Sequence, residues 1–203
     1  DECITCPGGT FSDVTNFSPC SKVPNGQQGQ LLESGNNYTS SGAVYAINCK
    51  NGTYNTDGFG KCDDVPDGKQ GQKSTVGRTH AASGAIHPVN CKKGTFNKDG
   101  TGPCVELEDG YRCSKILEDD ANNTDVQGET GCSDRIQCDG ALGQYRQQED
   151  GNECDIAPPG QQVQGQETGN DYTPSGAIYA INCKNGTYNT NGLGKCDDVP
   201  DGK

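Results

Sequence analysis

A stretch of 29 residues occurs twice in this chain, and it constrains the fold more than any single motif does. Residues 41–69 and 175–203 differ only at Val44/Ile178, Asp57/Asn191 and Phe59/Leu193. A weaker copy, SGAIHPVNCKKGTFNKDGTGPC, lies between them. Internal repetition on this scale predicts a repeat architecture, in which each unit packs against its neighbours.

Cysteines mark the repeated unit. Aligned on them, the chain divides into five modules, at residues 1–48, 49–90, 91–137, 138–182 and 183–203. In the three most similar modules the two cysteines are a constant 13 residues apart, which predicts that they pair within the module. The expected disulfides are Cys6–Cys20, Cys49–Cys62, Cys91–Cys104, Cys138–Cys154 and Cys183–Cys196.

The third module is different. Cys113 and Cys132 flank its variable loop, so we expect a sixth disulfide that clamps this loop beside the acidic run Glu118–Asp120. Six pairs leave Cys3, which lies just before Cys6. We expect Cys3 to bond a segment or a neighbouring chain outside these residues, and a free or capped thiol is the alternative.

The composition predicts that disulfides replace a large core. Apolar residues are 29% of the chain, Trp and Met are absent, and Gly accounts for 30 of 203 residues; typical globular chains are about 45–50% apolar. Each disulfide of this loop size stabilises by roughly 3 kcal/mol in the chain-entropy model. Thirteen cysteines in such a chain predict an oxidising, extracellular location. No stretch approaches the roughly 20 apolar residues that span a bilayer.

The local patterns predict strands and turns. In residues 43–50 (AVYAINCK) alternate side chains share a strand face, and Asn51-Gly52 before Thr53 is typical of a hairpin turn. The variable stretches, residues 31–40 and 73–82, are expected to form outward loops. The predicted fold is small, disulfide-rich and all-β, an elongated tandem array of β-hairpin modules of about 44 residues with little regular helix.

Net charge and glycosylation motifs indicate which kinds of molecule the chain can bind or carry. Net charge is −12, which argues against binding nucleic acid or anionic membranes. Much of the negative charge lies in residues 105–154, which predicts a solvated face, a cation site or a docking face for a basic partner. Five Asn-x-Ser/Thr sites are predicted to carry N-linked glycans: Asn16, Asn37, Asn51, Asn122 and Asn185.

Few residues of the sequence suggest a catalytic or metal-binding site, and we predict that the protein is not an enzyme. His80 and His87 are expected to be surface residues of a loop, and Cys3 and Cys6 form half of a metal or redox motif without a second pair. Asn55, Asp57 and Asp63 have part of the spacing of a calcium loop, but the acidic residue that ends such loops is missing. A tight turn is the favoured interpretation; calcium is the alternative, and we predict no other cofactor.

The module C-x2-G-[TF]-[YF]…G-x-x-C-x-x-[VL]-x-[DN]-G resembles the small cysteine-rich repeats of eukaryotic surface proteins, in particular the immobilisation-type surface antigens of ciliates. The CPGGTF sequence that begins at Cys6 is also similar to the openings of ephrin-receptor-like and tumour-necrosis-factor-receptor-like modules. The resemblance implies an extracellular, elongated and non-enzymatic chain.

Two functions are therefore expected. The first is a secreted, glycosylated structural repeat protein that self-associates into a cell-surface coat or a filament. The second is an adhesin or receptor-like ectodomain, which binds a partner or calcium through its variable loops and its acidic third module.

Overall fold

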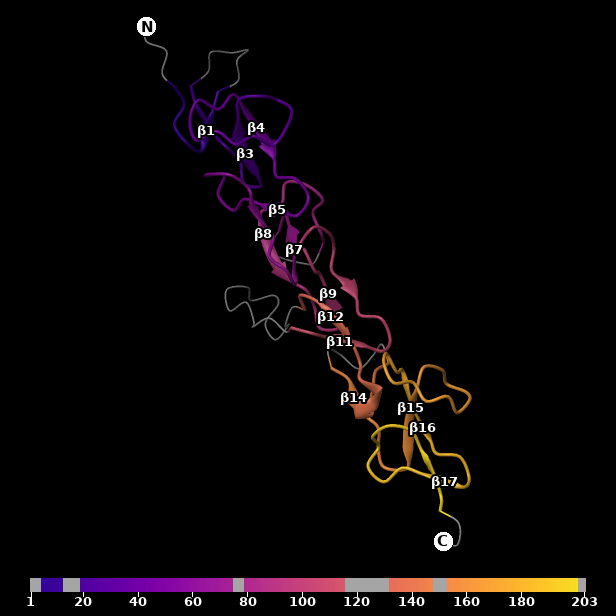
Figure 1. Ribbon diagram of the computed structural model, residues 1–203. Helices are drawn as coiled ribbons and strands as arrows, with labels where there is room; N and C mark the ends of the chain where they lie inside the picture. Colours follow the sequence, from indigo (N-terminus) through magenta and orange to yellow (C-terminus); the bar gives the residue numbers. More distant parts are fainter. Residues whose placement is uncertain (1–4, 13–18, 75–78, 116–131, 148–152, 201–203) are drawn as a thin grey trace. The chain divides into compact units, whose positions relative to one another are not determined.

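The computed structural model describes residues 5–12, 19–74, 79–115, 132–147 and 153–200. Within these ranges all regular structure is β, apart from one short 3₁₀ turn at Gly140–Leu142. The strands of the described residues pair into nine two-stranded antiparallel sheets, and each sheet joins two strands that are consecutive in the chain (Figure 1). The prediction of a small disulfide-rich all-β fold built from tandem hairpins is confirmed.

Two kinds of hairpin alternate along the chain. In the first kind, here called the disulfide hairpin, two-residue strands flank the loop that contains the second cysteine of a module. These are β1 (Thr10–Phe11) with β2 (Ser21–Lys22), β5 (Thr53–Tyr54) with β6 (Asp63–Asp64), β9 (Thr95–Phe96) with β10 (Val105–Glu106), β13 (Gln144–Tyr145) with β14 (Asp155–Ile156), and β17 (Thr187–Tyr188) with β18 (Asp197–Asp198).

The second kind, here called the loop hairpin, has strands of three or four residues and encloses a variable stretch. These are β3 (Gln27–Gln30) with β4 (Tyr45–Asn48), β7 (Lys69–Gln72) with β8 (His87–Asn90), β11 (Tyr111–Cys113) with β12 (Arg135–Gln137), and β15 (Gln161–Gln164) with β16 (Tyr179–Asn182). As predicted, the described variable residues lie between these strands, and Leu31 and Leu32 point outward with 57% and 62% of their surface exposed.

The described residues form two compact units. One contains residues 5–12, 19–74, 79–91 and 97–104, and the other contains residues 92–96, 105–115, 132–147 and 153–200. The elongated shape and the module boundaries of the sequence stay predictions.

One local prediction is wrong. The Asn51-Gly52 turn does not join two strands of one hairpin, because β4 pairs with β3 and β5 pairs with β6. The turn instead connects successive hairpins: Thr53 N–H donates to the Lys50 carbonyl at 3.1 Å, and Gly52 has a φ of +78°. The Asn-Gly pair specifies a turn but not its pairing. The true partner of β4 is QQGQ, whose composition has little strand propensity.

A cluster of three buried residues forms the core beneath each loop hairpin of the described chain. In the first module Val23, Gly29 and Ala43 meet; a Cβ placed on Gly29 would lie 2.9 Å from the Ala43 Cβ. The same three positions are occupied in turn by Val65/Gly71/Ala85, Leu107/Cys113/Cys132 and Ala157/Val163/Ala177. Where the first residue shrinks from Val to Ala, the second grows from Gly to Val. The cluster therefore varies in composition while staying filled.

We predict that this exchange can be reproduced by mutation. Gly71→Val should destabilise the protein by about 1–3 kcal/mol, because the new side chain meets Ala85 and Val65. Adding Val65→Ala should recover much of that loss, as in the Ala157/Val163 cluster. Urea unfolding of the two single variants and the double variant measures the coupling. Gly102→Val, where an added Cβ has no atom within 4 Å, is the control. If the changes in unfolding free energy of the two single variants simply add in the double variant, the two positions do not compensate each other and the prediction is contradicted.

Candidate functional site

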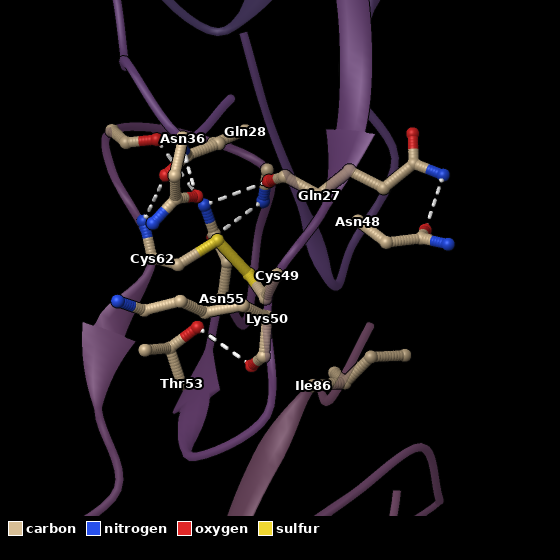
Figure 2. Close-up of a disulfide and its surroundings, with 12 residues drawn as sticks. Gln27, Gln28, Asn36, Asn48, Cys49, Lys50, Thr53, Asn55, Cys62 and Ile86 are labelled. Carbon is tan, nitrogen blue, oxygen red and sulfur yellow. Dashed lines mark hydrogen bonds between the residues drawn. A yellow bond between two sulfur atoms is a disulfide. The ribbon is translucent and has the colours of Figure 1, made fainter. Parts of the chain in front are cut away.

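Four of the six disulfides of the described residues lie at the junction between a loop hairpin and the following disulfide hairpin, whereas Cys6–Cys20 precedes the first loop hairpin and Cys113–Cys132 lies within one. The structure pairs Cys6–Cys20, Cys49–Cys62, Cys91–Cys104, Cys113–Cys132, Cys138–Cys154 and Cys183–Cys196. These are the pairs that the cysteine spacing predicts. At Cys49, for example, the bond ties the end of β4 to the residue that precedes β6, so the disulfide joins two successive hairpins (Figure 2).

A buried glutamine reinforces this junction. Gln28, in β3, accepts a hydrogen bond from the Cys62 backbone N–H at 2.9 Å through its side-chain oxygen, and its Nε2 donates to Asn36 Oδ1 at 3.1 Å (Figure 2). Gln70 and Gln162 accept from Cys104 and Cys196 at the same 2.9 Å. The bond spans 34 residues each time. The sequence patterns did not lead us to predict it, although the recurrence of glutamine at one repeat position was a usable signal.

A buried asparagine makes the second repeated contact. Asn55 Oδ1 accepts from the Gly58 N–H at 2.9 Å, while its Nδ2 donates to the Gln27 carbonyl at 3.0 Å. Asn189 repeats both bonds, at 2.9 Å each. One amide thus shapes the tight turn and holds it to the preceding loop hairpin.

This geometry bears on the calcium alternative. Asn55 Oδ1 is engaged by the turn, and Asp57 Oδ1 accepts from the Phe59 N–H at 2.8 Å. Asp63 is exposed in β6. The described part of the chain contains no group of three or more His, Cys, Asp or Glu side chains that could hold a metal ion. The arrangement is that of hydrogen-bonded turns.

The fourth module replaces the asparagine by Arg146, which the structure buries completely. Its Nη1 donates to the carbonyl oxygens of Leu107 and Glu108, at 3.5 and 3.1 Å. Arg146 N–H also donates to the Ala177 carbonyl at 3.1 Å, as Asn55 N–H does to Ala85 at 3.0 Å. The longer, positively charged side chain of Arg146 thus connects its turn to the preceding part of the chain, as the side chain of Asn55 does.

The third module changes its core and its surface together. Its disulfide Cys113–Cys132 occupies the core positions that Gly71 and Ala85 hold in the preceding loop hairpin. Beside it the Arg135 guanidinium lies 5.2 Å from the Phe96 ring centroid and 4.7 Å from that of Tyr111. Arg135 also pairs with Glu108 at 2.8 Å, and this hydrogen bond raises the pKa of Arg135 above its ordinary value. The acidic run Glu118–Asp120 lies outside the described residues.

Three of the predicted glycosylation sites can be placed. Asn37, Asn51 and Asn185 are exposed, and the last two occupy the same turn in two copies of the repeat. His80 Nε2 lies 3.1 Å from Asn51 Oδ1, and partial burial lowers the pKa of His80 below its ordinary value. Asn16 and Asn122 lie outside the described residues, and His87 begins β8.

Cys3 also lies outside the described residues. An external partner for Cys3 stays a prediction.

The chain matches no protein-family model, and no curated protein is similar to it. Among the described residues, no helix is long and apolar enough to cross a membrane.

We predict that the buried glutamine is a stability residue. Gln28→Ala should cost roughly 1–3 kcal/mol, because it leaves the partly buried Cys62 N–H without its acceptor. The neighbouring Gln27→Ala is the matched control, since it removes only the exposed bond to Asn48 Oδ1 and should change stability by a few tenths of a kcal/mol. Urea denaturation with the disulfides intact compares the two. An equal decrease in the free energy of unfolding in both variants would show that the hydrogen bond to Cys62 does not stabilise the protein more than the exposed bond does.

Proposed function

We propose that this chain is an extracellular, glycosylated structural repeat protein, whose copies associate into a surface coat or a filament. The observation that carries the proposal is the use of its buried polar side chains. Gln28, Asn55 and Arg146 are groups that could serve a binding site in another fold, and here they bond the backbone of neighbouring hairpins. These side chains therefore hold successive hairpins together.

The disulfides support the extracellular part of the proposal. Each described module joins its hairpins by a covalent bond and buries only a few small apolar residues. Such a chain gains stability from oxidised cysteines, which persist outside the cytosol. The exposed asparagines at Asn37, Asn51 and Asn185 suit the addition of glycans after secretion.

The repetition supports the structural part of the proposal. Residues of the Ser-Gly-Ala segment bond the first cysteine of their own module in the same way each time: Gly42, Gly84 and Gly176 donate their N–H groups to the carbonyls of Cys6, Cys49 and Cys138, at 2.7, 2.7 and 2.8 Å. A module that folds with the same internal contact each time is the kind of unit from which repeat proteins are built.

The first test is the association of the whole chain. Protein secreted by a eukaryotic host should show concentration-dependent association by sedimentation velocity, and coats or filaments by electron microscopy. The physical reason is that repeated surfaces offer several weak contacts at once. Particles that stay monomeric and monodisperse over a wide concentration range would overturn the structural proposal.

The second test is glycan occupancy. Enzymatic removal of N-linked glycans should lower the mass of the secreted protein, and glycopeptide mapping should place sugar on Asn51 and Asn185, because both side chains are exposed in the same turn. Asn51→Gln should remove one glycan, whereas Asn25→Gln, an exposed asparagine outside such a motif, should remove none. An unchanged mass after the enzymatic treatment would contradict the prediction.

A further inference from the structure

We propose that the outer edges of β4 and β16 are the self-association sites, and that each pairs edge to edge with the same strand of a second copy of the chain. The inference rests on the proposed function and specifies its contact. Both strands have the sequence Tyr-Ala-Ile-Asn, and one lies in each compact unit.

The register shows which backbone groups face outward. Gln27 pairs with Asn48 in the antiparallel β3–β4 ladder, and the Cys49 N–H donates to the Gly26 carbonyl at 2.8 Å. Residues alternate between facing the partner strand and facing away from it. The N–H and C=O groups of Ala46 and Asn48 therefore point away from β3. Cys183 N–H donates to Gly160 at 2.8 Å, which gives Ala180 and Asn182 the same orientation in β16.

These edges have no strand beside them within the described part of the chain. The sheets that contain β4 and β16 have two strands each, and the isolated bridges of β3 and β15, to Tyr38 and Tyr172, lie on the opposite edge. No backbone hydrogen bond joins the outward groups of Ala46 or Asn48 to another described residue. An uncovered edge with free donors and acceptors is a template for another strand.

The other two loop hairpins carry blocking residues at the position of Ala46. In β8 it is Pro88, which has no N–H to offer, and the β7–β8 ladder nevertheless keeps its full register opposite Gly71. In β12 it is Arg135, whose guanidinium lies against two aromatic rings. Proline and inward-held charge are the devices that natural sheets use against edge pairing. Two edges are thus closed, and two carry the small, uncharged residue alanine.

The chemistry of the open edge fits a second copy. In an antiparallel pairing centred on Ile47 of both copies, the outward N–H and C=O groups of Ala46 meet those of Asn48, so every donor finds an acceptor. The pairing is isologous, since the same surface serves both partners. The four residues are uncharged, so like charges do not face each other across it. Because each chain has two such edges, the pairing propagates from copy to copy.

The experiment copies the blocking residue that the chain already uses. Sedimentation velocity over a concentration series compares the full-length protein with Ala46→Pro, Ala180→Pro and the double variant. Either single variant should stop at dimers, and the double variant should associate roughly tenfold or more weakly than the wild type, so that it is mainly monomeric at concentrations where the wild type associates. Ala46→Arg with Ala180→Arg, which imitates the arginine of β12, repeats the block without proline.

Folding is checked in each variant by the resistance of the disulfide cysteines to alkylation and by circular dichroism. If the wild type associates and both folded double variants associate equally well, the edge inference is overturned and the proposed function survives. If the wild type never associates, the proposed function fails, and the edge inference fails with it. Association that falls in both folded double variants supports the edges as the contact.

Discussion

The hydrogen bond from the Cys62 amide to the buried Gln28 side chain, beside the Cys49–Cys62 disulfide, is the contact on which the architecture depends. A two-stranded hairpin alone is marginally stable in water. The covalent bond brings a loop hairpin and the next disulfide hairpin together, and the glutamine satisfies an amide that their contact would otherwise leave without an acceptor. The same pair of interactions recurs at Gln70 and Gln162.

Where the chain departs from this arrangement, it compensates nearby. The third loop hairpin has Arg112 in place of the glutamine, and it gains the disulfide Cys113–Cys132 in its core. In the fourth module Arg146 replaces the asparagine, and it donates to the carbonyl of Glu108, which lies between β10 and β11. Such local exchange is expected where small clusters stabilise the fold, because a single misfit has few neighbours to absorb it.

The use of buried polar side chains to hold the fold together also limits where other molecules can bind. Gln28, Asn55 and Arg146 are committed to the junctions. The groups that remain accessible to other molecules are on the surface: the exposed asparagines, the variable loops and the strand edges. Among these, the edges differ systematically from hairpin to hairpin. Pro88 and Arg135 stand where Ala46 and Ala180 leave the backbone accessible. In our proposal, this difference at one backbone position, in strands that otherwise share a register, determines which edges can accept another strand.

The sequence by itself determined the covalent frame. A constant spacing of cysteines in near-identical copies predicts the pairing, and a low apolar content predicts that disulfides replace a large core. It also placed the turns, because Asn51-Gly52 and Asp57-Gly58 favour turn conformations locally. Only the tertiary structure decided which strands pair and what the repeated polar residues do. The partner of β4 is the Gln-rich β3, whose strand character comes from its neighbours and not from its own propensity. The roles of Gln28 and Asn55 depend on amides and carbonyls that lie 34 and 28 residues away, and a distance of that kind is set by folding alone.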